Sequence, residues 1–169
     1  MSNRVRCTEC GRLCAGGEIF TVDAQSVCRT CLFGAVEPLC IYPIGIVVNG
    51  LERNGTDFGR TDSGEESRIE LAAGQRRFLY RLEDEAALTV VYWLHRARPV
   101  RSRFRRGLDG KETGLFATRT PDRLSRLGIQ DVRLLAVRDT VLYVQGLDAV
   151  NGTPVLDIKM CRHAPGKET

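Results

Sequence analysis

Hydrophobic and polar residues alternate in short runs over the C-terminal three quarters of the chain. The runs are rich in β-branched residues and are bounded by Gly, Asn, Asp or Pro, which is typical of strands. They predict strands at 44–48, 69–72, 88–94, 115–118, 132–137, 141–145 and 155–159.

Arg138 and Asp139 lie between two alternating runs and predict a hairpin turn. Phe78 and Leu82, four residues apart, predict one or two helical turns over 75–82. Seven strands with little helix predict a mainly β fold, either a small barrel or a sandwich.

The pattern changes along the chain in three places. Six of the seven cysteines lie in the first 40 residues, which predicts a separate module at 1–40 followed by a β domain at 41–163. Residues 49–67 are polar and rich in glycine and predict a long loop. Residues 164–169, with the sequence APGKET, predict a loose tail.

The cysteines of the first module are arranged as two C-x-x-C pairs. Cys7 and Cys10 form the first pair, Cys28 and Cys31 the second, and 17 residues separate the pairs. This spacing is typical of a zinc ribbon. Four thiolates fill the tetrahedral shell of zinc, so we expect a structural metal with no open position for water. Residues 18–22 look like one strand of a short hairpin between the pairs.

Other uses of these cysteines are weaker. A redox pair lacks the surrounding βαβ pattern, and an odd cysteine count without a signal peptide argues against a disulfide framework. Cys14 can replace Cys10 only with a poorer spacing, and Cys40 is spare. A ribbon of this kind can touch nucleic acid or a protein partner, and the sequence does not separate these uses.

Charge and composition narrow the function classes. The chain has 169 residues, a net charge of +4, and 22 arginines against 3 lysines. A GC-rich genome explains this bias, as does a surface that grips phosphate with planar guanidinium groups. No apolar run approaches the roughly 20 residues of a membrane span. The start of the chain has no apolar signal segment, so we expect a cytoplasmic protein.

Arginines are concentrated in two segments. Six lie within 96–106, where Arg101, Arg103 and Arg105 share one face of an extended chain, and Phe104 points the other way. This stripe suits a phosphate backbone, or else it is a solvated loop. The second segment, GLFATRTPDRLSRLG at 114–128, places Arg119, Arg123 and Arg126 behind a predicted strand, as a rim for an anionic or polar group.

Two further places carry candidate chemistry. His95 and Arg96 end an apolar strand, where a polar side chain can reach the mouth of a pocket. Alternatively, His95 is a single histidine at the edge of the sheet with no such role. Asp157 and Lys159 share one strand face. They either form an ion pair of little energetic weight, or Asp157 accepts a proton while Lys159 orients a substrate. The chain lacks both the Gly-x-Gly-x-x-Gly motif and the P-loop, which argues against a Rossmann-type nucleotide domain.

Four motifs occur in a familiar order. They are YPIGIV at 42–47, VVYWLHRA at 90–97, GLFATRTPDR at 114–123 and LYVQGLDAVNGTPVLDIK at 142–159. Together they resemble the TsaA-like family, whose tRNA methyltransferases are called TrmO-type. The resemblance covers residues 41–160 and leaves only the zinc ribbon outside it.

The resemblance implies a β-barrel that binds S-adenosylmethionine, forms a homodimer and methylates the exocyclic nitrogen of a threonylcarbamoyl-modified adenosine in tRNA. It implies RNA contacts for Arg123 and Arg126, added RNA affinity from 101–106, substrate orientation by Lys159, and Asp157 as the candidate base. By motif, the cofactor contacts are His95, Arg96, Arg119, Ile129, Asp148, Ala149, Val150 and Asn151.

The chain also departs from the family pattern. Leu124, Ser125 and Arg126 replace a usual Pro-Asn-Pro, and the last motif ends Lys-Met-Cys where Pro-Tyr usually follows the lysine. The loop at 49–67 lacks a Pro-Arg-Gln type of segment. Two rival functions therefore stay open. One is a non-catalytic module that senses the cofactor or binds RNA or protein, and the other is methyl transfer to a substrate other than tRNA.

Overall fold

The computed structural model describes residues 4–51, 65–107 and 109–161. The chain divides into two units. One comprises Met1–Cys40 and Arg96–Arg126, and the other Ile41–His95 and Leu127–Thr169. We call them the cysteine unit and the barrel unit. The sequence pattern placed residues 96–126 in the β domain, whereas the structure groups them with the N-terminal segment. The predicted tail at 164–169 lies outside the described residues.

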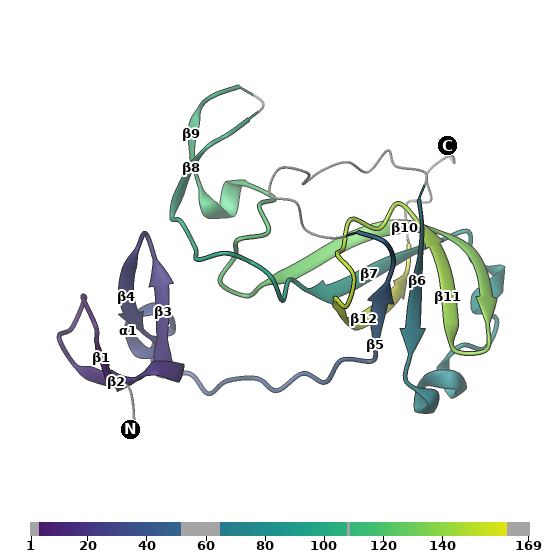
Figure 1. Ribbon diagram of the computed structural model, residues 1–169, viewed down its shortest axis with the longest axis horizontal. Helices are drawn as coiled ribbons and strands as arrows, with labels where there is room; N and C mark the ends of the chain where they lie inside the picture. The colour runs from purple at the N-terminus through teal and green to yellow at the C-terminus, as the bar shows by residue number, and fades with distance from the viewer. Residues whose placement is uncertain (1–3, 52–64, 108, 162–169) are drawn as a thin grey trace. The chain divides into compact units, whose positions relative to one another are not determined.

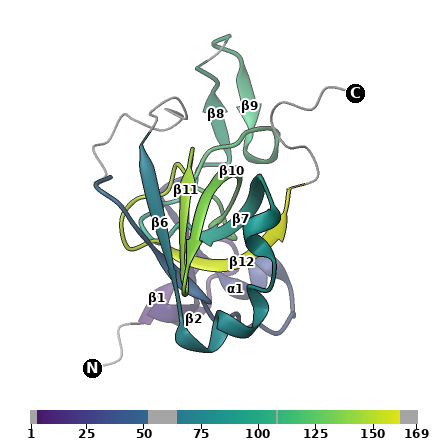
Figure 2. The ribbon, with the colours of Figure 1, turned by 90° about the vertical axis from the view of Figure 1, so that its right-hand side faces the viewer.

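Six antiparallel strands close the barrel in the order β10-β11-β6-β5-β12-β7 (Figures 1 and 2). This confirms the predicted fold class, a mainly β chain with a small barrel. The strands are β5 (Gly45–Val48), β6 (Glu66–Leu71), β7 (Ala87–Trp93), β10 (Leu127–Arg138), β11 (Val141–Gln145) and β12 (Pro154–Met160). The helical turns predicted at 75–82 are two 3-10 helices, Ala73–Phe78 and Leu82–Asp84.

The barrel core follows from alternation along these strands. In β11, Leu142 and Val144 are fully buried while their neighbours are partly exposed, and β6 alternates in the same way. Fully buried Val47, Leu88 and Val155 come from three other strands. Alternate side chains of a strand point to opposite faces, so one face of each strand fills the barrel.

Two glycines are required by close approach of neighbouring strands. A Cβ on Gly128 in β10 would lie 2.3 Å from the ring of Tyr92, which faces it across the β7–β10 register. A Cβ on Gly45 would lie 2.5 Å from the carbonyl oxygen of Glu70. The predicted hairpin turn is also present, because Arg138 pairs with Val141 and Asp139 adopts a left-handed φ of 56°.

Two sequence predictions were wrong in detail. Residues 115–118 do not form a strand: Leu115–Ala117 is a 3-10 helix, closed by the amide and hydroxyl of Thr118, which both donate to the Leu115 carbonyl. The loop predicted at 49–67 ends earlier, because β6 begins at Glu66 and Ser67 is buried within it. Residues 52–64 of that loop lie outside the described residues.

The cysteine unit is built from hairpins. Strands β1 (Arg4–Arg6) and β2 (Leu13–Ala15) form one, and β3 (Ile19–Val22) with β4 (Gln25–Cys28) forms the second, followed by the short helix α1 (Arg29–Phe33). The third pairs β8 (Arg103–Arg105) with β9 (Glu112–Gly114). Between β2 and β3, Gly16–Glu18 is a 3-10 helix, so the strand predicted at 18–22 starts one residue later.

Candidate functional site

The loop at 146–151 of the barrel unit is held by one side chain of β10. Gln130 donates from Nε2 to the carbonyl of Gly146 at 2.6 Å and accepts from the Asp148 amide through Oε1 at 2.9 Å. The Tyr92 hydroxyl lies 3.5 Å from both Gln130 Oε1 and the Asp148 carbonyl. Gln130 therefore fixes the backbone where the cofactor turn is expected.

Asn49 holds the other end of the same loop. Its side-chain amide donates to the hydroxyl of Ser67 at 3.0 Å and to the Ala149 carbonyl at 2.9 Å. The Asn49 backbone amide in turn donates to Oδ1 of Asn151 at 3.1 Å. Among the described residues, no acceptor pairs with the amide N–H of Ala149 or Val150. The loop is thus fixed at both ends, with two backbone donors available to a ligand.

His95 lies beside the same loop. Its Nδ1 is 3.4 Å from the hydroxyl of Thr153, which is only 2% exposed and follows the loop directly. Tyr92, three residues earlier, is 6% exposed. Burial, and to a lesser degree the charge of Asp148, raises the pKa of Tyr92 to about 12. The phenol is therefore neutral and can donate a hydrogen bond. His95 thus contacts Thr153, two residues after the turn 148–151, and its role as a cofactor contact stays a prediction.

Three other predicted residues of the barrel unit lie on its strands. Ile129 of β10 is 64% exposed, opposite Val91, and presents an apolar side chain to solvent. Asp157 and Lys159 of β12 form an ion pair at 2.5 Å, with both side chains about half exposed. Oδ1 of Asp157 also accepts from the Ile158 amide at 2.9 Å. Both carboxylate oxygens thus have partners, as the ion-pair alternative requires.

The remaining predicted cofactor residues, Arg96 and Arg119, belong to the cysteine unit and are exposed. Here the structure shows an organising residue that sequence reasoning missed. Asp122, 4% exposed, accepts from the Arg98 amide at 2.8 Å and from Arg98 Nε at 3.1 Å. This bidentate contact closes the segment 98–122 into a loop. A buried carboxylate with arginine as partner is stable only with such full pairing.

Of the arginines expected to face RNA in this segment, Arg123 is the most constrained. Its Nη1 donates to the Thr118 carbonyl at 2.7 Å, which folds the chain back over the 3-10 helix. Arg126 is partly buried and has a left-handed φ of 52°. Arg119 is therefore more open to a ligand than Arg123.

The arginine stripe forms strand β8 of a hairpin. Arg103 and Arg105 are exposed and Phe104 is half-buried, as an extended chain requires. Arg103 pairs with Glu112 of β9 at 3.6 Å, and Arg106 pairs with Asp109 in the connecting turn. Arg101 precedes the strand and is exposed. The stripe is thus an ordered element in which two of these four arginines have acidic partners.

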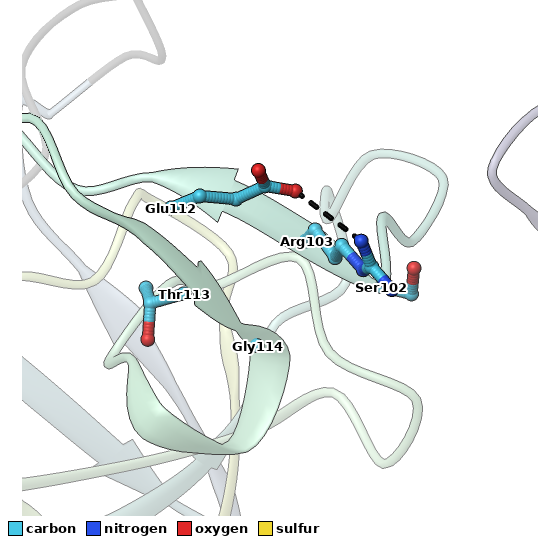
Figure 3. Close-up of a pocket in the computed structure, with 5 residues that line it drawn as sticks. All are labelled: Ser102, Arg103, Glu112, Thr113 and Gly114. Carbon is cyan, nitrogen blue, oxygen red and sulfur yellow. Dashed lines mark ion pairs between the residues drawn. The ribbon is translucent and has the colours of Figure 1, made fainter.

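An open pocket of about 530 Å³ lies on this hairpin, lined by Ser102, Arg103, Glu112, Thr113 and Gly114 (Figure 3). The Arg103–Glu112 pair faces one side of it, and Thr113 points the other way. Arg103 is the only predicted site residue in its lining. This pocket is therefore separate from the loop at 146–151.

The four predicted metal ligands converge. The Sγ atoms of Cys7, Cys10, Cys28 and Cys31 all lie within 4.8 Å of one another, and the Cys7–Cys31 and Cys10–Cys28 separations are 3.9 Å. A tetrahedron with Zn–S bonds of about 2.3 Å has sulfur atoms about 3.8 Å apart, so the donor set fits zinc. Cys14 is outside this cluster.

The electrostatics of the cluster favour a cation. Arg12 donates from Nε to Cys10 Sγ at 3.4 Å, and this contact lowers the pKa of Cys10 to about 6. Hydrogen bonds with Cys10 and then Cys28 raise the pKa of Cys31 to about 12. Backbone hydrogen bonds from Cys10 and then from Cys28 lower the pKa of Cys7, and the Cys28 amide lies 3.3 Å from Cys7 Sγ. Four sulfurs at this distance become thiolates together only when a metal ion balances their charge.

Comparison with known proteins decides the family. A model of the tRNA-methyltransferase O N-terminal domain matches residues 57–163, more than half of the chain. The chain belongs to this family. The match confirms the resemblance inferred from the four motifs, and it leaves the cysteine ribbon outside the family domain.

Two kinds of protein name occur among the relatives that this member of the tRNA-methyltransferase O family matches. A "probable S-adenosyl-L-methionine-binding protein" of Methanothermobacter thermautotrophicus is 37% identical over 121 residues, covering 70% of this chain and 87% of the relative. A human "tRNA (adenine(37)-N6)-methyltransferase" is 44% identical over 52 residues, covering 31% of this chain and 12% of the human protein.

A solved structure supports the fold. TrmO from Pseudomonas aeruginosa has a TM-score of 0.62 and 25% identity, covering 78% of this chain and 61% of that chain. Two Archaeoglobus fulgidus relatives are matched over 20% and 58% of their lengths. The chain therefore spans less than two thirds of several proteins that it resembles.

Sequence reasoning missed three organising residues: Gln130 and Asn49, which hold the loop at 146–151 of the barrel unit, and Asp122, which closes the segment 98–122 of the cysteine unit. Each is polar, lies near a predicted motif, and acts through backbone groups that are distant in sequence. Asn49 and Ala149, for example, are 100 residues apart. A polar residue inside an apolar run, such as Gln130 in LGIQDV, is the one sequence signal that was present.

Proposed function

We propose that this chain is an S-adenosylmethionine-dependent methyltransferase that acts on tRNA, with the exocyclic nitrogen of a threonylcarbamoyl-modified adenosine as acceptor. Membership of the tRNA-methyltransferase O family carries this proposal. Relatives named as S-adenosyl-L-methionine-binding proteins and as tRNA (adenine(37)-N6)-methyltransferases support it.

The barrel unit offers a place for the cofactor. The amides of Ala149 and Val150 suit the ring nitrogens of an adenine, and Gln130 and Asn49 hold the backbone that carries them. Ile129 supplies apolar contact, and Asp148, Asn151 and His95 supply polar groups. Arg96 and Arg119 are the proposed cationic contacts, suited to the carboxylate of the cofactor.

When bound, S-adenosylmethionine supplies a methyl group on a positively charged sulfur, which an amine nitrogen can attack directly. The protein therefore contributes mainly by holding the acceptor nitrogen in line with that methyl group. The attacking nitrogen must also lose a proton, and Asp157 is the proposed acceptor. Asp157 would take up this proton and become a neutral carboxylic acid, while Lys159, its ion-pair partner, orients the substrate.

The proposal includes three further assignments. The metal held by Cys7, Cys10, Cys28 and Cys31 is zinc in a structural role. Arg101, Arg103, Arg105, Arg123 and Arg126 contact RNA, and the protein works as a homodimer in the cytoplasm. No helix among the described residues has the length and apolar character needed to cross a membrane.

Cofactor binding is tested by calorimetric titration with S-adenosylmethionine. We expect micromolar binding, weakened about tenfold or more by Gln130→Leu, because the loop loses the two hydrogen bonds that Gln130 makes to it. Arg119→Ala is expected to weaken binding as well. Gln75→Leu, the same change in the 3-10 helix Ala73–Phe78, is the matched control and leaves binding unchanged. Equal affinities for the wild type, Gln130→Leu and Arg119→Ala would contradict this site.

Transfer is tested with labelled cofactor and two tRNA pools, one with and one without the threonylcarbamoyl modification. We expect methylation of the modified pool, and a loss of rate in Asp157→Asn with cofactor affinity retained. Cofactor binding without transfer to either pool would favour the non-catalytic, cofactor-sensing alternative. Transfer to other acceptors alone would exclude tRNA as the substrate.

A further inference from the structure

The positive charge of this protein is concentrated in one segment. Residues 96–126 contain nine arginines and one lysine against the acids Asp109, Glu112 and Asp122, a net charge of +7. The whole chain is +4, so the rest of it is net negative. An imbalance of this size within one segment is the footprint of an anionic partner.

This segment is attached to the cysteine ribbon by backbone contacts. Val22 of β3 and Val100 form a parallel bridge, in which the Asp23 amide donates to the Val100 carbonyl at 2.9 Å and the Val100 amide donates to the Thr21 carbonyl at 3.2 Å. Asp23 Oδ1 also accepts from the Ser102 amide at 2.8 Å. The chain thus enters the arginine hairpin directly from the edge of β3.

The strand that carries this attachment depends on the cysteine cluster. Strand β3 pairs along its length with β4, whose last residue is Cys28, opposite Ile19. Helix α1 follows and contains Cys31, and its Phe33 packs edge-on against Phe20 of β3 at 5.1 Å. Among the described residues of this unit, the buried hydrophobic ones are few: Cys7, Val27, Cys28, Val100 and Leu115. A segment with so little apolar core needs its metal to keep β3 in place.

Two of the four arginines at 101–106 form no ion pair among the described residues. Arg98, Arg103 and Arg106 have carboxylate partners, whereas among the described residues no carboxylate forms an ion pair with Arg101 or Arg105. Phe116, in the 3-10 helix after β9, is 83% exposed. Cationic groups with an exposed aromatic ring are the combination that binds single-stranded nucleic acid, through phosphates and stacked bases.

We propose that the cysteine unit is a metal-dependent docking surface for single-stranded RNA. The metal-held ribbon fixes β3, β3 fixes the entry to the hairpin, and the hairpin presents Arg101 and Arg105 to phosphates while Phe116 stacks on a base. The proposal rests on the RNA substrate of the proposed function and adds that its affinity depends on the metal.

The first test measures binding of a fluorescein-labelled tRNA anticodon stem–loop to the full chain by anisotropy, at several salt concentrations. We expect Arg101→Ala/Arg105→Ala to weaken binding about tenfold and to flatten the salt slope by about 1.5, because two phosphate contacts are lost. Phe116→Ala is expected to weaken binding about tenfold with the slope unchanged. The control Arg77→Ala/Arg133→Ala removes the same charge from two exposed positions of the barrel unit and leaves affinity nearly unchanged.

The second test removes the metal with a chelator. RNA affinity should fall at least as far as in the double arginine variant, and added zinc should restore it. Asp23→Ala, which removes the acceptor of the Ser102 amide, should weaken RNA binding with the metal still bound. Asp23→Asn keeps that acceptor and should behave as the wild type. Titration with S-adenosylmethionine shows in each case that the barrel unit is intact.

Two results would overturn the proposal. One is RNA binding by the metal-free protein with unchanged affinity and salt slope. The other is competition by polyglutamate as strong as that by unlabelled RNA, which would assign the surface to acidic proteins. Metal-dependent RNA binding without methyl transfer would leave this proposal standing and would count against the proposed activity alone.

Discussion

The barrel unit buries its apolar side chains, whereas the cysteine unit hardly does. Val47, Ile69, Leu88, Leu142 and Val155 of the barrel are all 0% exposed. The most buried side chains of the cysteine unit are Cys7 and Cys28, at 1% and 2%, which are two of the four clustered thiols. One unit is stabilised by removing hydrocarbon from water. The other has little such core, and a metal on its four clustered sulfurs would stabilise it together with backbone hydrogen bonds.

This difference explains where each kind of chemistry is placed. A closed barrel holds a loop such as 146–151 rigidly, because Gln130 and Asn49 project from a scaffold that is itself well packed. Few residues of the cysteine unit form a buried core, and most of its described side chains are exposed or partly exposed. It is thus suited to displaying arginines, and the proposed metal would supply the order that its small core does not.

Removal of the metal should produce the largest difference in behaviour between the two units. With a chelator, or in Cys28→Ser, we expect amide hydrogen exchange in 4–40 to become fast while the strands of the barrel remain protected. Without the cation the four sulfurs lose the bonds that would hold them together, and little apolar packing replaces those bonds. Cys40→Ser, which changes an exposed cysteine outside the cluster, is the control. Slow exchange in 4–40 after metal removal would show that the cysteine unit keeps its structure without a metal, against the contrast drawn between the two units.

Truncating the barrel core should have the next largest effect. Leu142→Ala is expected to lower the free energy of unfolding by about 3 kcal/mol, since a fully buried leucine leaves a cavity. The exposed Leu135 of β10 gives a matched control, for which Leu135→Ala should cost less than about 1 kcal/mol. Denaturant unfolding followed through Trp93 of β7 measures both. Equal losses would mean that the core does not carry the stability of the barrel.

The smallest effect we predict is a loss of barrel stability at alkaline pH. The pKa of Tyr92 is raised from 10.0 to about 12, so folding favours the neutral phenol. Its contribution is fully present below pH 10 and is lost as the pH rises from 10 to about 12. Unfolding measured across this range should show a steeper decline in the wild type than in Tyr92→Phe. Parallel declines would indicate that Tyr92 ionises as it does in the unfolded chain.

Much of the barrel could be predicted because its signals are local. Alternation along 141–145 and the Arg138–Asp139 turn each involve neighbours in sequence, and both are present as expected. The 3-10 helix at Leu115–Ala117 was read as a strand because its short apolar run fits either structure. Hydrogen bonds from Thr118 to the Leu115 carbonyl close the 3-10 helix, and the hydrophobic pattern does not predict these bonds.

The candidate site was only partly predictable for the same reason. Four motifs identified the family, and the spacing of the cysteines selected the cluster that the structure brings together. Gln130 and Asn49 could not be assigned from the sequence, because their partners are backbone groups in a loop that only closure of the barrel brings to them.

By itself, the sequence determined a mainly β barrel, a module of four clustered cysteines and the family of the chain. The strands follow from periodicity and the cysteine module from spacing, which are properties of neighbouring residues, whereas the barrel and the family follow from the resemblance of four motifs. Only the tertiary structure decided that residues 96–126 belong with the cysteines, that Asp122 closes this segment, and that Glu112 forms its ion pair with Arg103. These outcomes depend on pairings such as Val22 with Val100 and Asp23 with Ser102, between residues nearly 80 positions apart. Contacts of that range form only when the whole unit has folded, since the loop between their ends must close first.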